Sequence, residues 1–219
     1  MTITLTEAPP AAPVARQIGR LQAYRDDGPI CTTIGRLTLG RLIPLPGTVV
    51  AALTTAALLL VAGAQEHAIP VLYAPLVALL LTGPSATHPH TGRIDWLVPP
   101  ILRGIEYGYL AVLGFAQGVS APLIYGLLAV LAYHHYDTVY RTRQHLWPRG
   151  WVFRAGLGWE GRMLIAAFAG LFGQLSAAYA VLAAYLGVLF GVESVIAWVR
   201  ADRGSGVQVN LEEEAEEAS

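Results

Sequence analysis

The chain has 219 residues, of which 54% are hydrophobic and only 13% are charged. Soluble domains carry about 25% charged residues, so this composition excludes a disordered protein, a nucleic-acid binder and a typical cytosolic globular domain. It predicts an all-α, polytopic membrane helix bundle. All 14 basic residues are arginine, and Cys31 is the single cysteine, which excludes lysine chemistry and an intramolecular disulfide.

The N-terminal part of the chain is predicted to lie outside the bilayer. Residues 1–15 are rich in Pro and Ala and predict a disordered N-terminus with no cleavable signal peptide. Residues 16–47 mix arginines with apolar positions at roughly helical spacing, among them Ile34, Leu37 and Leu42. This pattern predicts a cytoplasmic, interfacial amphipathic segment.

Residues 48–200 predict a six-helix transmembrane domain. The spans are expected at 48–64, 69–83, 97–116, 120–136, 162–179 and 181–199. The last two are expected to form a hairpin that turns near Ser176–Ala180. Residues 201–219 contain five glutamates and predict a disordered acidic tail.

The arginines predict the orientation of this bundle. With six spans, every arginine falls on the side of the two termini, and the opposite loops contain none. The positive-inside rule therefore predicts a multi-pass protein of the cell membrane with both termini in the cytoplasm. The five tryptophans are expected at the headgroup level of the same side.

Small residues predict how the helices pack. Glycines recur at four-residue spacing at Gly104 and Gly108, at Gly114 and Gly118, and at Gly187 and Gly191. This spacing allows two helix backbones to approach closely. The contact is expected within the chain, and a homodimer face is the alternative.

Ionisable residues cluster at one depth of the predicted bundle. Such residues are costly inside a membrane and usually face protein or water. Arg103 and Glu106 are three residues apart and share a helix face, and Glu193 lies about 10 Å inside the sixth span. Four helices are thus expected to bring one set of side chains to the cytoplasmic mouth of the bundle: Arg103, Glu106, His134, His135, Asp137, Arg141, Glu160, Arg162 and Glu193.

This set predicts a site for a phospholipid or an isoprenoid phosphate. Guanidinium groups bind phosphate bidentately, so the phosphate-binding candidates are Arg103, Arg141 and Arg162. Carboxylates can act as bases or hold Mg²⁺, and a histidine can transfer a proton near neutral pH. The catalytic candidates are therefore Glu106, His134, His135, Asp137, Glu160 and Glu193. The identity of any metal stays open.

Each of these side chains also has a structural interpretation. Arg103 and Glu106 can form a local ion pair, and Glu160 with Arg162 can serve a helix start. His134 can reach the interface while His135 packs against a neighbour. The arginines after the fourth span can simply set the topology.

Three strings carry a resemblance to a known family: GRIDWLVPPILRGIEYGY, LAYHHYDTVYRTRQ and LGWEGRMLI. Over residues 16–200 the chain resembles an uncharacterised actinobacterial integral-membrane domain family associated with CDP-alcohol phosphatidyltransferases. Those transferases are similar in layout, with six spans and an amphipathic N-terminal helix. Their metal-binding signature is absent after Asp95, so the resemblance transfers no catalytic residue.

Three functions are compatible with these observations. The first is a membrane enzyme that transfers a lipid-linked phosphate or a CDP-alcohol. The second is a non-catalytic membrane module that partners a phosphatidyltransferase, in which case the polar residues should neutralise one another. The third is a small transporter, which would need polar residues through the whole membrane depth.

Overall fold

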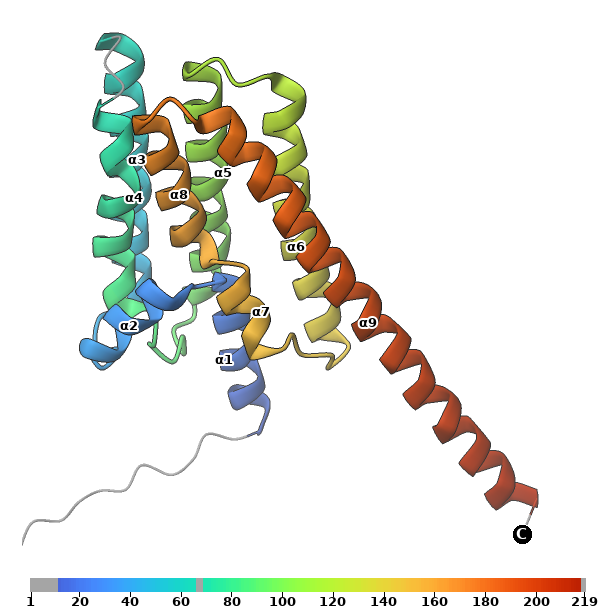
Figure 1. The fold of residues 1–219 in the computed structure, drawn as a ribbon. Coiled ribbons are helices and arrows are strands. Elements are labelled where there is room, and N and C mark those ends of the chain that lie inside the picture. The colour runs from blue at the N-terminus through green and yellow to red at the C-terminus, as the bar shows by residue number, and fades with distance from the viewer. Residues whose placement is uncertain (1–11, 66–68, 218–219) are drawn as a thin grey trace, which may run out of the picture.

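The computed structural model describes residues 12–65 and 69–217, and these residues form helices and no strands (Figure 1). The α-helices are α1 (Ala12–Arg25), α2 (Pro29–Leu37), α3 (Pro44–Gln65), α4 (Ile69–Thr82), α5 (Val98–Ala116), α6 (Ala121–Arg143), α7 (Gly150–Ala155), α8 (Gly158–Leu171) and α9 (Leu175–Glu217). Two single-turn 3-10 helices, Gly83–Ser85 and Asp95–Leu97, join α4 to α5. The predicted all-α class is confirmed.

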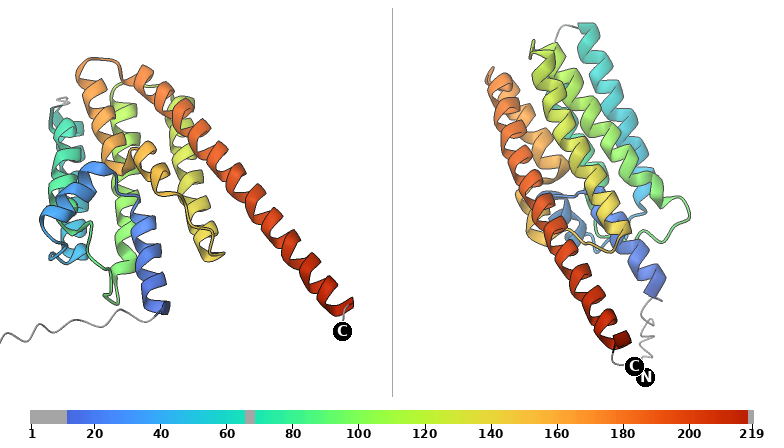
Figure 2. Two further views of the ribbon diagram at one scale, coloured as in Figure 1. Left: turned by 60° about the horizontal axis from the view of Figure 1, so that its bottom comes forward. Right: turned by 90° about the vertical axis from the view of Figure 1, so that its right-hand side faces the viewer.

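Six of these helices build the bundle, with α3 packed on α4 and α5, α4 on α8, and α6 on α9 (Figures 1 and 2). Apolar side chains on facing sides form the core, as at Leu102, Leu113 and Leu127. The Tyr179 hydroxyl donates to the Leu110 carbonyl oxygen at 2.6 Å and joins α9 to α5. The shorter helices α1, α2 and α7 all lie at one end of this bundle.

Two helices are long and apolar enough to cross a membrane, through Pro44–Val61 in α3 and Leu175–Ala201 in α9. Each of the six predicted spans corresponds to a helix, but α4 and α8 have only 14 residues each. At about 1.5 Å per residue they are shorter than the ~30 Å hydrocarbon core of a bilayer. The six-span arrangement therefore stays a proposal.

The turn between α8 and α9 lies earlier than the predicted Ser176–Ala180. It occupies Phe172–Gln174, where Gly173 has a φ of +66°. The Gln174 N–H donates to the Ala169 carbonyl oxygen at 2.8 Å, which is the backbone pattern of a glycine C-cap. The left-handed conformation is accessible to Gly173, and this local requirement places the turn.

Both chain ends were predicted to be disordered, and the described residues of both are helical. Helix α1 begins at Ala12, and residues 1–11 lie outside the described residues. Helix α9 continues to Glu217 through the segment predicted as an acidic tail. Extending an existing helix costs no new nucleation, and Ala and Glu are good helix formers.

The glycine pairs pack in different ways. A side chain at Gly114 would press on Ile124 and Tyr179, so this glycine permits a close contact between α5, α6 and α9. Gly104 and Gly108 instead line a cavity of about 330 Å³ beside Thr55 of α3. The intramolecular contact is thus observed at Gly114, and a homodimer face stays a prediction.

Candidate functional site

Arg162, in the first turns of α8, is a charged residue whose side chain has no exposed surface. Its Nε donates to Glu106 Oε1 of α5 at 2.6 Å, and its Nη2 donates to Asp26 Oδ2 at 2.6 Å. Its Nη1 donates to the Gly156 carbonyl oxygen at 2.9 Å. Arg162 thus ties α8 to α5 and to the turn between α1 and α2.

Arg103 and His135 extend this arrangement. Arg103 Nη1 donates to Glu106 Oε2 at 2.7 Å and lies 2.6 Å from His135 Nε2. His135 Nε2 also lies 3.2 Å from Asp26 Oδ2. We call Asp26, Arg103, Glu106, His135 and Arg162 the central network. Its two carboxylates and two guanidiniums cancel in charge.

Asp26 is the member of the central network that sequence reasoning missed. It is buried and has a left-handed φ of 51° in the turn after α1. Burial by itself would raise the pKa of this carboxyl, but Arg162 and the two histidines outweigh burial and hold it well below its usual value. The dense charged string Arg25-Asp26-Asp27-Gly28-Pro29 was the available signal.

The residues on either side of Asp26 in the sequence, Arg25 and Asp27, also form hydrogen bonds within the protein. Arg25 Nε donates to Asp27 Oδ2 at 2.6 Å, and Trp159 Nε1 donates to Asp27 Oδ1 at 2.9 Å. Trp159 is fully buried, so its ring faces protein, and its expected depth at the headgroup level stays a prediction. The buried anchor forms because the indole N–H finds an acceptor inside the protein.

The two histidines have the reverse of the positions considered in the sequence analysis: His134 packs against a neighbour, and His135 is the more exposed of the two. The His134 ring is buried and stacks on Phe190 with ring centroids 3.7 Å apart. Its Nε2 lies 3.6 Å from Asp26 Oδ1, and neither atom has a hydrogen-bond partner. The His135 side chain is 14% exposed and borders a cavity of about 230 Å³ together with Arg103.

Asp137, Arg141 and Glu193 form a second, separate group, the α6–α9 cluster. Arg141 Nη1 and Nη2 donate to the two Glu193 carboxylate oxygens at 2.9 and 2.6 Å. Arg141 Nε lies 2.8 Å from Asp137 Oδ2. This bidentate pair joins α6 to α9 and engages both terminal nitrogens of Arg141 with Glu193.

Glu160 lies in a third place, at the start of α2. Its Oε2 accepts from the Gly28 N–H at 2.9 Å and its Oε1 accepts from the Cys31 N–H at 3.0 Å. Helix α2 has no capping side chain of its own, so Glu160 satisfies its free N–H groups from another helix. Gly158 makes this approach possible, because a side chain there would collide with the Gly28 backbone.

Burial raises the pKa of Glu160 to about 7. Hydrogen bonds from the Cys31 and Gly28 N–H groups lower the pKa of Glu160, whereas the negative charge of Asp27 raises it further. Because Glu160 precedes the predicted fifth span, its carboxyl belongs to the interface between α2 and α8.

The nine predicted site residues therefore do not meet in one cavity. Four of them join Asp26 in the central network, namely Arg103, Glu106, His135 and Arg162. His134 lies beside it, three form the α6–α9 cluster, and Glu160 caps α2. The predicted ion pair of Arg103 with Glu106 is observed.

Asp26, His134 and His135 offer ligand atoms that all lie within 4.8 Å of one another, close enough for a metal ion. Two guanidiniums lie against this group, since Arg162 donates to Asp26 Oδ2 and Arg103 lies against His135 Nε2. A divalent cation would add charge beside two buried arginines. Mg²⁺ also prefers oxygen ligands to imidazole nitrogen, so these residues fit Mg²⁺ poorly.

Comparison with known proteins assigns the chain to a family. Residues 15–216 match the model described as a family of unknown function (DUF5941), and the chain belongs to that family. No curated protein and no solved structure matches it. The association with CDP-alcohol phosphatidyltransferases stays a prediction.

Replacing Arg162 with leucine should destabilise the protein severely. Asp26 and Glu106 would remain buried without their main partner, and breaking a buried ion pair costs about 3–5 kcal/mol. The free energy of unfolding of the purified protein in detergent measures the effect. Arg154→Leu is the control, because Arg154 is exposed and should change stability by about 0.5 kcal/mol or less. Equal loss in both variants would contradict the role given to Arg162.

Glu160 should make stability depend on pH. Its pKa is about 7 in the folded protein and close to its ordinary 4.5 when unfolded, so the folded state holds the proton more tightly. Its contribution is complete below about pH 4.5 and is lost as the pH rises to about 7. The difference in stability between the wild type and Glu160→Gln should shrink across this window.

The comparison with Glu160→Gln is necessary because folding also shifts the pKa of His90. Burial and Arg25 lower the pKa of His90, which makes its own contribution run in the opposite direction. His90 is the same in both proteins and drops out of the difference. A difference that does not change between about pH 4.5 and 7 would refute the assignment.

Proposed function

We propose that the chain is a multi-pass membrane module that partners a phosphatidyltransferase or related enzyme of lipid-linked phosphate metabolism and is not itself the catalyst. One observation carries the proposal: each predicted phosphate-binding arginine is engaged by carboxylates. Arg103 pairs with Glu106, Arg162 with Glu106 and Asp26, and Arg141 with Asp137 and Glu193. This is the neutralised arrangement expected of a structural module.

A phosphate would have to displace these carboxylates. A displaced carboxylate would stay buried without a partner, which costs several kcal/mol per group. Glu106 and Asp26 are almost completely buried, with 0% and 1% of their surface exposed. The charges are thus better suited to joining helices than to binding a substrate that comes and goes.

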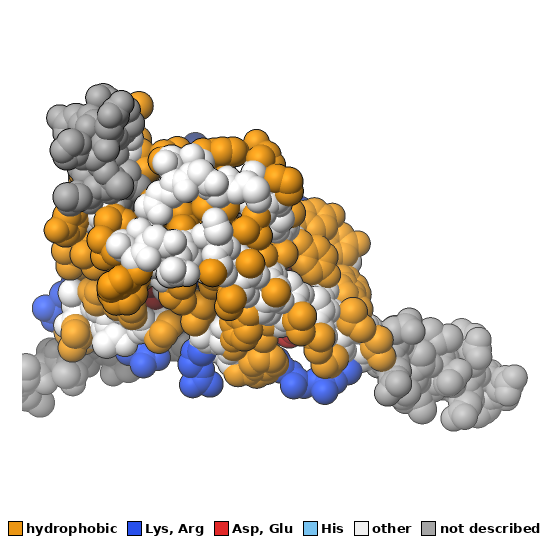
Figure 3. All heavy atoms as spheres, turned by 45° about the horizontal axis from the view of Figure 1, so that its top comes forward, with side chains coloured by type: hydrophobic (Ala, Val, Ile, Leu, Met, Phe, Trp, Pro, Cys, Tyr) orange, Lys and Arg blue, Asp and Glu red, His pale blue; other side chains and the backbone are white. Residues whose placement is uncertain are grey.

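Exposed apolar side chains support the placement in a membrane. Leu53 and Leu60 of α3, Leu80 of α4, Phe168 of α8 and Val188 of α9 each expose 64% or more of their surface. Figure 3 shows that hydrophobic side chains cover much of the visible face. The arginines that can be seen lie mainly along its lower edge. Large exposed apolar areas are rare on soluble monomers.

The arginines support the orientation. Helices α1, α2 and α7 lie at one end of the bundle, and so do the ends of α5, α6 and α8 that carry Arg103, Arg141 and Arg162 (Figure 1). The turns Gln117–Ser120 and Phe172–Gln174 at the other end contain no arginine. The proposed topology therefore has six spans and both termini in the cytoplasm.

An enzyme acting on a phospholipid or a polyprenyl phosphate is the second candidate. It is favoured by the cavity of about 230 Å³ beside His135 and Arg103, which also reaches Thr138. The Thr138 hydroxyl and Arg103 Nε are buried there without a hydrogen-bond partner. A small polar group of a substrate could use these two atoms.

Cysteine labelling tests the topology. Ser120 and Gly150 are exposed at opposite ends of the bundle, whereas the native Cys31 is buried. In intact cells a membrane-impermeant maleimide should label Ser120→Cys and should label Gly150→Cys only after permeabilisation. The wild type is the background control. Labelling of both positions in intact cells would contradict the proposed orientation.

Complementation separates the module from the enzyme. In a strain that lacks the chain and shows altered lipids, His135→Gln should restore the lipid composition if the chain is a module. If His135 is a catalytic acid or base, its loss should lower the activity about 10²–10⁴-fold. Arg162→Leu controls for a disrupted fold and should fail in either case. Co-purification of a phosphatidyltransferase with the wild type completes the test, and its absence would count against the module.

A further inference from the structure

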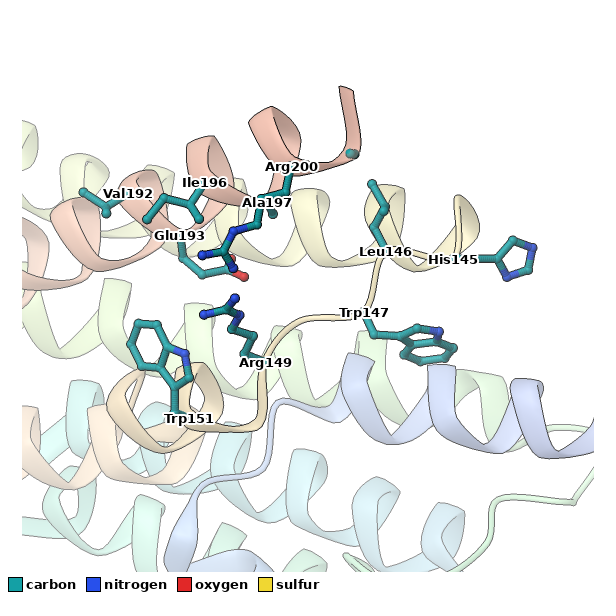
Figure 4. A pocket seen from close by; sticks show the side chains of 11 residues that line it. His145, Leu146, Trp147, Arg149, Trp151, Val192, Glu193, Ile196, Ala197 and Arg200 are labelled. Carbon is teal, nitrogen blue, oxygen red and sulfur yellow. The ribbon is translucent and has the colours of Figure 1, made fainter. Parts of the chain in front are cut away.

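We propose that a pocket between α9 and the segment before α7 binds the phosphate of an anionic membrane phospholipid. The pocket has a volume of about 420 Å³. One wall carries Trp147, Arg149 and Trp151, and the other carries Val192, Ile196 and Arg200 of α9 (Figure 4). We call it the α7–α9 pocket. Its arginines, Arg149 and Arg200, are not among the phosphate-binding candidates predicted from the sequence.

Two arginines make this pocket basic. Among the described side chains, neither Arg149 nor Arg200 has a carboxylate within 4.0 Å, and both line the pocket from opposite walls (Figure 4). In this respect they differ from Arg103, Arg141 and Arg162. Two guanidiniums offer several N–H donors in planes that match phosphate oxygens.

Glu193 also lines the pocket and must be considered, because a carboxylate repels phosphate. Both of its oxygens accept hydrogen bonds from Arg141, at 2.9 and 2.6 Å. Its charge is therefore compensated within the protein, and the guanidiniums of Arg149 and Arg200 dominate the field at the entrance.

The apolar part of the pocket favours a lipid as the source of the phosphate. Val192, Ile196 and Arg200 are four residues apart and share one face of α9, so an apolar stripe leads from the guanidinium into the hydrophobic part of the helix. Val192 is 53% exposed and Ile196 is 43% exposed. A free phosphate gains nothing from this stripe, whereas an acyl chain would cover it.

The two tryptophans fit the same depth. Trp147 and Trp151 are 42% and 44% exposed, and tryptophan is enriched where a membrane meets water. The lipid would thus place its headgroup at Arg149 and Arg200 and an acyl chain along Val192 and Ile196. This inference depends on the proposed membrane placement but not on the proposed partner enzyme.

Lipid binding to the purified full chain tests the inference. Phosphatidylglycerol is titrated into detergent-solubilised protein, and retained lipid is measured by native mass spectrometry, with phosphatidylcholine as the zwitterionic probe. The wild type should retain phosphatidylglycerol in preference. Arg149→Gln with Arg200→Gln should weaken its retention about tenfold or more, because hydrogen bonds to charged groups are lost.

The matched control is Arg143→Gln with Arg154→Gln. It removes the same charge from two exposed arginines outside the pocket and should retain phosphatidylglycerol like the wild type. Equal loss in both double variants would show a nonspecific charge effect and overturn the site. Equal retention of the two lipids by the wild type would also overturn it.

Competition identifies the source of the phosphate. Inorganic phosphate and glycerol 3-phosphate lack acyl chains and should displace phosphatidylglycerol only weakly. Displacement by either at concentrations like those of the lipid would overturn the lipid assignment in favour of a soluble phosphate. The assay contains no partner enzyme, so its failure would leave the proposed partnering to be judged by complementation.

Discussion

The burial of Arg162 is the constraint on which the rest of the bundle depends. A guanidinium does not lose its proton at any physiological pH, so the interior must supply acceptors for all of its nitrogens. Glu106, Asp26 and the Gly156 carbonyl do so from three different parts of the chain. Because each carboxylate is buried as well, removing one partner leaves a charge that water cannot reach.

This constraint determines how the N-terminal helices join the bundle. Asp26 brings the turn between α1 and α2 against α8, and Trp159 then donates to Asp27. Glu160, one residue further along α8, caps α2 through the N–H groups of Gly28 and Cys31. Three positions in the first turns of α8, 159, 160 and 162, therefore bind one turn of the N-terminal segment.

The use of charge for structure also shapes the functional proposal. Carboxylates and arginines that engage each other inside the protein are costly to separate, and this favours a module over a catalyst. Arg149 and Arg200, which have no such carboxylate partner among the described side chains, line the α7–α9 pocket. Membership of a family of unknown function adds no activity of its own, so the chemistry of these side chains is the available guide.

Local signals predicted much of this protein. Long apolar runs, proline at helix starts and the lack of charge indicated the helices, since these features act within one or two turns. The pair of Arg103 with Glu106 was predictable because residues three apart share a helix face. The clustering of arginines at one end of the bundle was predictable because successive helices alternate in direction, which assigns each loop to one end.

Other features depended on contacts between distant segments. Asp26 and Arg162 are 136 residues apart, and no periodicity connects them. The same holds for Glu160 and α2, and for the separation of Asp137, Arg141 and Glu193 from the central network. The sequence by itself determined an all-helical chain with apolar helices and one arginine-rich end. Only the tertiary structure decided which charges meet, because that depends on how each helix is rotated about its own axis, and packing against other helices sets this rotation.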